Sequence, residues 1–435
     1  MKFTKLKKIM ITFVAAATFS TTFAVPTKSF ADMEIFEAAA ESAISVDYKT
    51  GKILYGKDID TPRGIASMTK ILTAYLTLEQ IKNGKLTWDE RVTISDYAYS
   101  LSTDMRLSGV PMEKGASYTI KELYDSALIA SANSSAVALA EKVGGSEQKF
   151  VDLMREKVKS WGIKDAFLVN ASGLNNEYLP ENQRYPATKE DDENLMSARD
   201  VAIVARHLLE DFPEVLEVTK KTTAPFGEGT ASRVDMQTWN WMLKGMSNEY
   251  EGVDGLKTGT TEKAGQCFVG TAEKNGWRLI TVVLDADNAE TDSGARFTVT
   301  KEMLDYSFEN WKQEVILKKG ATFPAAKSFP VRDGKEKQVP LILNEDVTKW
   351  IAKGMDTTNY KLVFKAEKKK ALVAPVKKDT IAGKVTIDLT EDENGYLEKH
   401  NEESYPMATK NGVERDNFFI VAGKHFLEYI SSLAN

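Results

Sequence analysis

Hydrophobic positions follow two different periods along the larger, N-terminal part of the chain, and the changes of period predict the order of strands and helices. Short apolar runs at Ala43–Asp47 and Lys52–Tyr55 flank a polar, glycine-containing turn, which is typical of a β-hairpin. Apolar residues then recur at helical spacing. Two further strands, Gln266–Ala272 and Trp277–Asp285, flank an Asn-Gly pair, a strong hairpin signal. This order predicts an α/β (α+β) domain in which both hairpins share one antiparallel sheet.

Start and stop signals divide the helical middle of this domain. The first helix begins near Ser67 and runs to about Ile81, where an Asn-Gly pair ends it. Thr119 and Glu122 form a capping box that opens another helix, which should end near Ala130. The stretch between these two helices is mixed in composition and should be rich in loops. After a tight connection at Ser131-Ala132-Asn133, a further helix should follow, which Gly144-Gly145 stops.

Three more helices are expected further along the chain. They lie at Ser146–Trp161, after the capping residue Ser197, and at Lys301–Trp311. Residues 176–194, between the first two of these helices, are rich in Asp and Glu. We expect this acidic stretch to be a solvated surface insertion.

The pattern changes again after residue 312. Short alternating runs, separated by Gly, Pro and Lys, predict a small all-β domain at residues 313–410. These runs are Val339–Leu343, Tyr360–Phe364, Leu372–Val376 and Lys384–Leu389.

Both ends of the chain carry apolar segments. At the C-terminus, Asn417–Leu433 has one broad apolar face but is too short and too charged to span a bilayer. This predicts an amphipathic, membrane-anchoring helix within residues 411–435, and the alternative is a terminal helix packed on a domain. At the N-terminus, lysines precede the apolar stretch Ile9–Ala24 and a small-residue cleavage site at Ala31. This predicts a signal peptide at residues 1–31, with an uncleaved anchor as the alternative.

Composition excludes several classes of function. The formal net charge of the 435 residues is -6, and the absence of a basic face argues against a nucleic-acid partner. Three His and one Cys are too scattered in the sequence to form a metal site. No glycine-rich cofactor loop is found, so we expect no cofactor. A single Cys also excludes an internal disulfide.

Candidate chemistry begins with Ser67 and Lys70, which lie three residues apart and therefore on one face of the first helix. In the first turn, the unpaired N–H groups and the helix dipole favour a developing negative charge. A neutral Lys70 is then placed to accept the proton of the Ser67 hydroxyl, as covalent catalysis requires.

Two further motifs follow in order along the chain. Ser131 and Asn133 form an S-x-N motif, and Lys257-Thr258-Gly259 form a K-T-G motif. The ordered set S-x-x-K, S-x-N and K-T-G resembles that of penicillin-binding proteins and serine β-lactamases. The residues around the motifs are similar to low-molecular-mass penicillin-binding proteins that act as serine-type D-alanyl-D-alanine carboxypeptidases. The resemblance extends from about Ala43 to the C-terminus.

The resemblance implies a catalytic role for three side chains. Ser67 attacks the carbonyl of a D-Ala–D-Ala bond and becomes an acyl ester, while Lys70 accepts its proton. Burial and a second cation, for which Lys257 is the candidate, would lower the pKa of Lys70. Ser131 relays the proton to the leaving amine.

Substrate binding is implied for the remaining motif residues. Asn133 bonds the peptide backbone, and Lys257 with Thr258 holds the terminal carboxylate. The backbone N–H groups of Ser67 and Thr260 form the oxyanion hole. Gly259 lets the strand approach the substrate closely, because a side chain there would block the cleft.

The resemblance also implies the domain order and the partners. A β-lactamase-like catalytic domain at residues 32–312 precedes the β-rich domain and the amphipathic helix. The expected partners are peptidoglycan stem peptides ending in D-Ala–D-Ala, β-lactam antibiotics and the membrane surface. The protein is therefore expected to be exported to the outer face of the cytoplasmic membrane and the cell wall.

Two alternatives share parts of this pattern. A class A β-lactamase needs a glutamate that activates the deacylating water, and its usual E-x-x-L-N setting is absent between Ser134 and Leu256. A non-enzymatic wall-binding protein would have lost a catalytic residue, and none is lost. Arg296 is expected to bond a carboxylate within the fold, and a contribution to substrate binding is the alternative.

Overall fold

The computed structural model describes residues 36–367, 370–392, 394–398 and 403–433. The signal peptide predicted at residues 1–31 lies outside the described residues, so its cleavage remains a prediction.

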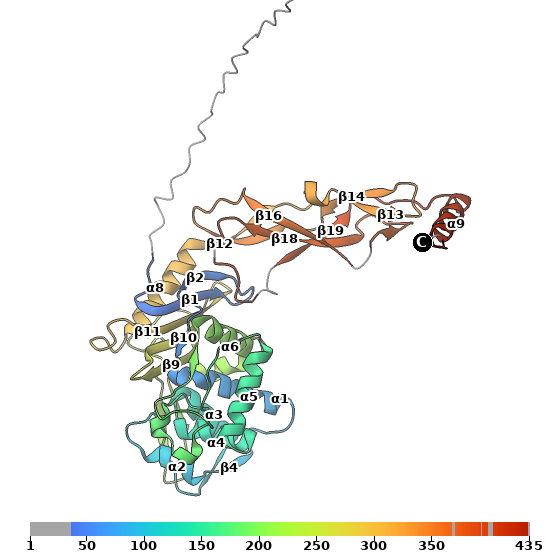
Figure 1. Ribbon diagram of the computed structural model, residues 1–435. Coiled ribbons are helices and arrows are strands. Elements are labelled where there is room, and N and C mark those ends of the chain that lie inside the picture. The colour runs from blue at the N-terminus through green and yellow to red at the C-terminus, as the bar shows by residue number, and fades with distance from the viewer. Residues whose placement is uncertain (1–35, 368–369, 393, 399–402, 434–435) are drawn as a thin grey trace, which may run out of the picture. The chain divides into compact units, whose positions relative to one another are not determined.

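A five-stranded antiparallel sheet forms the centre of the first domain, as the hydrophobic pattern predicts (Figure 1). Its order is β2-β1-β11-β10-β9, so the first hairpin and the last strands do share one sheet. The bounds are β1 Ala40–Asp47, β2 Ile53–Lys57, β9 Val253–Thr261, β10 Gly265–Lys274 and β11 Trp277–Ala286. At the predicted turn, Asn275 and Gly276 have φ of 54° and 77°, which suits a tight two-residue hairpin.

Both faces of the sheet are buried. Helix α8 (Ala295–Asn310) packs on one face, where Ala43 and Val283 belong to its apolar cluster. Helix α6 (Ala198–Asp211) packs on the other face, where Ile44 and Val282 join the main core. Alternate residues of a strand therefore point to opposite apolar layers, which explains the nearly continuous apolar runs in the sequence.

The helical middle contains the expected helices and several shorter elements that were not predicted. Its helices and 3-10 turns are η1 Ala66–Thr69, α1 Lys70–Lys82, α2 Asp96–Thr103, α3 Ile120–Ile129, α4 Asn133–Gly144, α5 Glu147–Ser160, η2 Asn176–Tyr178, η3 Glu181–Gln183, α6, η4 Pro213–Val215 and α7 Leu216–Thr219. The capping box of Thr119 and Glu122 is confirmed. Helix α2 lies in the stretch expected to be loop-rich. It was not predicted because its eight residues are too few to show a clear helical period.

The helical middle also contains three pairs of short antiparallel strands. They are β3 (Arg63–Gly64) with β6 (Leu195–Met196), β4 (Arg91–Thr93) with β5 (Ser117–Thr119), and β7 (Thr223–Phe226) with β8 (Val234–Gln237). Most residues of the acidic stretch 176–194 are exposed or half-buried, but Asn176 and Leu179 near its start and Glu193 and Asn194 at its end are buried. The predicted surface insertion is therefore anchored to the core at both ends.

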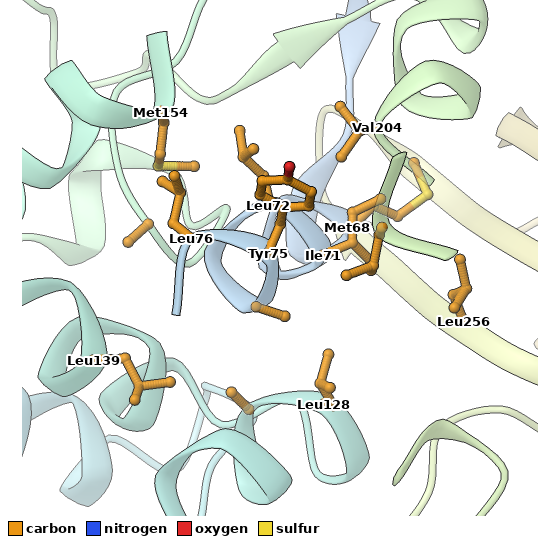
Figure 2. Close-up of a cluster of buried hydrophobic side chains, with 14 of the residues drawn as sticks. Met68, Ile71, Leu72, Tyr75, Leu76, Leu128, Leu139, Met154, Val204 and Leu256 are labelled. Carbon is orange, nitrogen blue, oxygen red and sulfur yellow. The ribbon is translucent and has the colours of Figure 1, made fainter. Parts of the chain in front are cut away.

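Helix α1 is buried on all sides at the centre of the main core (Figure 2). Side chains of α1 and of the preceding turn η1 lie among side chains from five surrounding elements. Those labelled are Met68 of η1 and Ile71, Leu72, Tyr75 and Leu76 of α1, surrounded by Leu128 of α3, Leu139 of α4, Met154 of α5, Val204 of α6 and Leu256 of β9. An all-round apolar helix is typical of a fully buried position. This packing holds the Ser67–Lys70 segment at its first turn in a fixed place.

A β-rich second domain follows α8, with its own apolar core. Its bounds are β12 Trp311–Leu317, η5 Pro324–Ala326, β13 Ser328–Arg332, β14 Gln338–Leu343, β15 Val347–Ala352, β16 Tyr360–Ala366, β17 Leu372–Val373, β18 Ile381–Leu389 and β19 Ser404–Thr409. Strands β12 and β15 pair together, and the other strands form one sheet in the order β16-β18-β19-β14-β13-β17. Helix α9 (Phe418–Leu433) comes last. Among the described residues, no helix has the length and apolar content to cross a membrane.

Candidate active site

Ser67 lies in the 3-10 turn η1, directly before α1, and its side chain is half-buried. Lys70 is the first residue of α1, and its Nζ lies 2.9 Å from Ser67 Oγ. The turn preceding a buried helix therefore brings the predicted nucleophile and base within hydrogen-bond distance.

The neighbours of Lys70 determine where its lone pair points. Lys70 Nζ donates to Asn133 Oδ1 at 2.8 Å and to the carbonyl oxygen of Ser172 at 2.7 Å. A neutral amine has two N–H groups, and these two oxygens can only accept. Because both N–H groups are used by these oxygens, the lone pair of Lys70 Nζ faces its third neighbour, the Ser67 hydroxyl. The geometry therefore suits a neutral Lys70 that receives the Ser67 proton.

Burial also favours the neutral form of Lys70. Only 1% of Lys70 is exposed. Burial, and then the charge of Lys257, hold the pKa of Lys70 well below its ordinary value. Both causes disfavour a positive charge at this position.

The S-x-N motif joins α3 to α4, as the start and stop signals predict. Ser131 has a φ of 58°, so the backbone turns sharply there. Asn133 begins α4, and its Nδ2 donates to the carbonyl oxygen of Ser108 at 3.0 Å. Both ends of the Asn133 amide are therefore bonded within the protein, one to Lys70 and one to Ser108. The sequence predicted only a substrate contact for this residue.

The K-T-G motif lies on β9, an edge strand of the sheet. A Cβ atom at Gly259 would lie 2.6 Å from the carbonyl oxygen of Ile65 and 3.2 Å from the Met68 nitrogen. The glycine is therefore required by the close approach of β9 to η1. From the sequence we expected a side chain at this position to block the substrate, whereas in the structure it would first collide with the backbone around Ser67.

Lys257 and Arg296 add positive charge beneath the cleft. Lys257 is 2% exposed, and its Nζ donates to the carbonyl oxygen of Thr258 at 3.0 Å. Burial, and then Arg296, lower the pKa of Lys257 to about 7. Arg296 Nη1 donates to the carbonyl oxygens of Gly259 at 2.8 Å and Cys267 at 3.2 Å. Arg296 Nε also donates to Gln266 Oε1 at 3.1 Å, so backbone oxygens and an amide oxygen take the place of the expected carboxylate.

A cleft of about 620 Å³ opens above these residues. Among the motif residues it is lined by Ser67, Ser131, Thr258, Gly259 and Thr260. Lys70, Asn133 and Lys257 are buried beneath this lining.

Two tryptophans in the cleft were missed by the sequence analysis. Trp239 and Trp241 both line the cleft, and Trp239 is 48% exposed. The Trp239 indole N–H donates to the carbonyl oxygen of Ala130 at 3.2 Å, beside Ser131. In the sequence both residues look like core positions, so no local signal distinguishes them from tryptophans buried in the fold.

Known proteins match this chain over most of its length. The family model described as D-alanyl-D-alanine carboxypeptidase matches residues 27–288. The model described as penicillin-binding protein 5, C-terminal domain, matches residues 311–415. Together the two matches cover the sheet, the three motifs and the β-rich domain.

Individual relatives agree with the family models. The chain is 31% identical to the D-alanyl-D-alanine carboxypeptidase DacF of Bacillus subtilis, over 87% of each chain. The crystal structure of a peptidoglycan synthesis regulatory factor, PBP3, from Streptococcus pneumoniae has a TM-score of 0.70 and 42% identity, covering 87% of this chain and 100% of that one. Penicillin-binding protein D2 from Listeria monocytogenes, in its ampicillin-bound form, has a TM-score of 0.51 and 29% identity, covering 63% of this chain and 100% of that one.

Proposed function

Because this chain belongs to the D-alanyl-D-alanine carboxypeptidases, a family of low-molecular-mass penicillin-binding proteins, we propose that Ser67 is its acylated nucleophile. The protein is a serine-type carboxypeptidase of the bacterial cell wall. The substrate we propose is a peptidoglycan stem peptide ending in D-Ala–D-Ala, from which the terminal D-Ala is released.

The observation that carries the assignment of roles is the hydrogen-bonded pair of Ser67 and Lys70. Ser67 Oγ attacks the carbonyl carbon between the two D-Ala residues as its proton passes to Lys70 Nζ. The C–N bond then breaks, and the leaving amine takes a proton through the Ser131 hydroxyl. An acyl ester on Ser67 remains and is hydrolysed by water.

Cations and backbone donors complete the proposed site. Lys257 and Thr258 hold the carboxylate of the terminal D-Ala, which would favour the charged form of Lys257. The N–H groups of Ser67 and Thr260 stabilise the oxyanion, and such donors contribute about 3–4 kcal/mol in other serine hydrolases. Asn133 positions Lys70, in addition to any contact with the peptide.

The fate of the acyl enzyme separates this function from that of a β-lactamase. We expect many turnovers of D-Ala release from a pentapeptide, but a slowly decaying covalent adduct with penicillin. The physical reason is that the Lys70–Ser131 pair serves the hydrolytic water, and a bulky penicilloyl group obstructs that water more than a peptide does.

Intact-protein mass spectrometry and an assay for released D-Ala measure both halves of this prediction. The adduct should add the mass of one penicillin molecule to the chain and should be absent in the Ser67→Ala variant. Rapid hydrolysis of penicillin without a detectable adduct would instead favour the β-lactamase.

Peripheral membrane attachment through α9 is the second part of the proposal. Six large apolar side chains of this helix are 46–81% exposed: Phe418, Phe419, Ile420, Phe426, Leu427 and Ile430. On another side of the helix, Val421 is buried and His425 Nε2 lies 2.8 Å from Asp333 Oδ1. The helix therefore contacts the β-rich domain while a broad apolar surface stays open. Such a surface suits the interface of a bilayer.

Removal of residues 417–435 should release the protein from membranes and leave carboxypeptidase activity intact. The cut is placed after Asp416, because Val413 belongs to the core of the β-rich domain. The variant carrying Phe419→Asp and Phe426→Asp should also be released, whereas Val363→Asp, an exposed apolar residue on β16, should not. Co-sedimentation with phosphatidylglycerol-containing vesicles measures this. A truncated protein that still sediments with vesicles, or that unfolds, contradicts the anchor.

A further inference from the structure

A buried glutamate lies behind the active site without taking part in the proposed chemistry. Glu147 is the first residue of α5 and only 2% exposed. Its Oε1 accepts a hydrogen bond from the Ala171 backbone N–H at 2.9 Å, and its Oε2 accepts one from the Tyr97 hydroxyl at 2.8 Å. Burying a carboxyl group is costly, and these two hydrogen bonds offset part of that cost. A buried glutamate at this position therefore calls for a structural or functional reason.

We propose that Glu147 is a positioning residue for acylation, which holds the turn Ala171–Gly173 against Ser67 and Lys70. This inference rests on the proposed function, because it assigns Glu147 a task in the acylation of Ser67. Glu147 acts through the turn and touches neither the substrate nor the reacting atoms.

The turn connects Glu147 to the base through two adjacent residues. Ala171 is held on both sides, because its N–H bonds Glu147 and its carbonyl oxygen accepts from Thr73 Oγ1 at 2.7 Å. The next carbonyl oxygen, that of Ser172, accepts from Lys70 Nζ. That bond occupies one of the two N–H groups of a neutral Lys70, so it helps to direct the lone pair to Ser67. A displaced Ser172 would let the amine rotate away.

Gly173 shows how little the turn can move. It has a φ of 83°, and a Cβ atom there would lie 1.9 Å from the carbonyl oxygen of Ala66 and 2.9 Å from the Ser67 nitrogen. The turn is thus in direct contact with the backbone that carries the nucleophile. A shift toward Ser67 is blocked by the backbone, and a shift away from it breaks the contact with Lys70. Asn170 Oδ1, which accepts from the Gly173 N–H at 2.7 Å, closes the turn from within.

The second hydrogen bond of Glu147 links it to helix α2. Tyr97 lies on α2, and the chain after α2 contains Ser108, whose carbonyl oxygen accepts from Asn133. Asn133 and Ser172 supply the two acceptors of Lys70. Glu147 therefore bonds both the turn that contains Ser172 and the helix that precedes the Ser108 segment.

This position calls for two hydrogen-bonding atoms on one side chain, of which the one facing the Ala171 N–H must be an acceptor. The groups facing Glu147 are Tyr97 of α2, the Ala171 N–H and, from α4, the Glu141 carboxyl. Burial, with a smaller effect of Glu141, raises the pKa of Glu147 to about 7, against the lowering effect of the two hydrogen bonds. A glutamine retains a carbonyl oxygen for Ala171 and an N–H for the Tyr97 oxygen. The isosteric amide should therefore keep the turn in place, and alanine should not.

The experiment compares Glu147→Ala and Glu147→Gln with Phe150→Leu. Phe150 lies on the same helix and is fully buried, so its substitution costs packing without a bond to the turn. The measurements are the second-order rate constant for acylation by a fluorescent penicillin, the kcat and KM for D-Ala release, and the thermal unfolding midpoint. All rates are taken at a temperature at which every variant is folded.

We expect Glu147→Ala to slow acylation at least tenfold and to lower kcat with little change in KM. Glu147→Gln should stay within about threefold of the wild type, as should Phe150→Leu despite its lower unfolding midpoint. A folded Glu147→Ala variant with wild-type acylation would overturn the inference. So would a Glu147→Gln variant as slow as Glu147→Ala, or a loss in Phe150→Leu that matches it. Failure of the proposed function would appear differently, as a wild-type protein that is neither acylated nor active.

Discussion

Replacement of Ser67 by alanine should abolish covalent labelling by penicillin and reduce D-Ala release by a factor on the order of 10⁴–10⁶. The substitution removes the atom that forms the acyl ester, so no other group can take over the same reaction path. Its effect on stability should be small, because the hydrogen bond recorded for Ser67 Oγ is the one with Lys70. Loss of activity without loss of folding is therefore the expected result.

Fluorescent penicillin labelling, followed by denaturing gel electrophoresis, measures the first effect, and an enzymatic assay for D-Ala measures the second. Ser102→Ala is a suitable control, because the Ser102 hydroxyl donates to the Tyr99 carbonyl oxygen within α2, at 2.7 Å, and Ser102 belongs to none of the motifs. The control should be labelled like the wild type. Labelling that persists in Ser67→Ala would show that another residue is the nucleophile.

Replacement of Lys70 by methionine should lower the acylation rate by at least about 10³, since a general base within a cooperating unit contributes that much or more. Methionine has a similar length but cannot accept the Ser67 proton. The variant also leaves Asn133 Oδ1 and the Ser172 carbonyl without their shared donor, at a cost of about 1–3 kcal/mol for each buried acceptor. Circular dichroism should therefore show a folded but less stable protein. Lys82→Met, on the exposed end of the same helix, is the matched control.

The pH dependence of acylation gives a second test of Lys70. Its pKa is lowered by burial and by Lys257, so the neutral, proton-accepting form is present at a lower pH than for an exposed lysine. The wild-type acylation rate should therefore be high above this pKa and should fall as the pH decreases through it. The residual rate of Lys70→Met should lack that step. A wild-type rate that increases on acidification would contradict a neutral base.

Local patterns were sufficient to predict most of the fold. The Asn-Gly hairpin, the capping box at Thr119 and the left-handed glycine that ends α4 are set by a few neighbouring residues. The short apolar runs of the strands and the helical period between them also predicted the common sheet. Helix α2 was missed because it is short, and burial of Tyr97 and Leu101 against the core is what identifies it.

The sequence by itself determined the order and chemical type of the motif residues, because the three motifs depend only on short spacings. The tertiary structure decided how those residues are arranged. Asn133 bonds Lys70, Gly259 is required by the backbone around Ser67, and the turn at Gly173 supports the base. Each of these contacts joins segments far apart in the chain, so no local pattern can reveal it. The lowered pKa of Lys70 has the same origin, since burial and a nearby cation exist only in the folded protein.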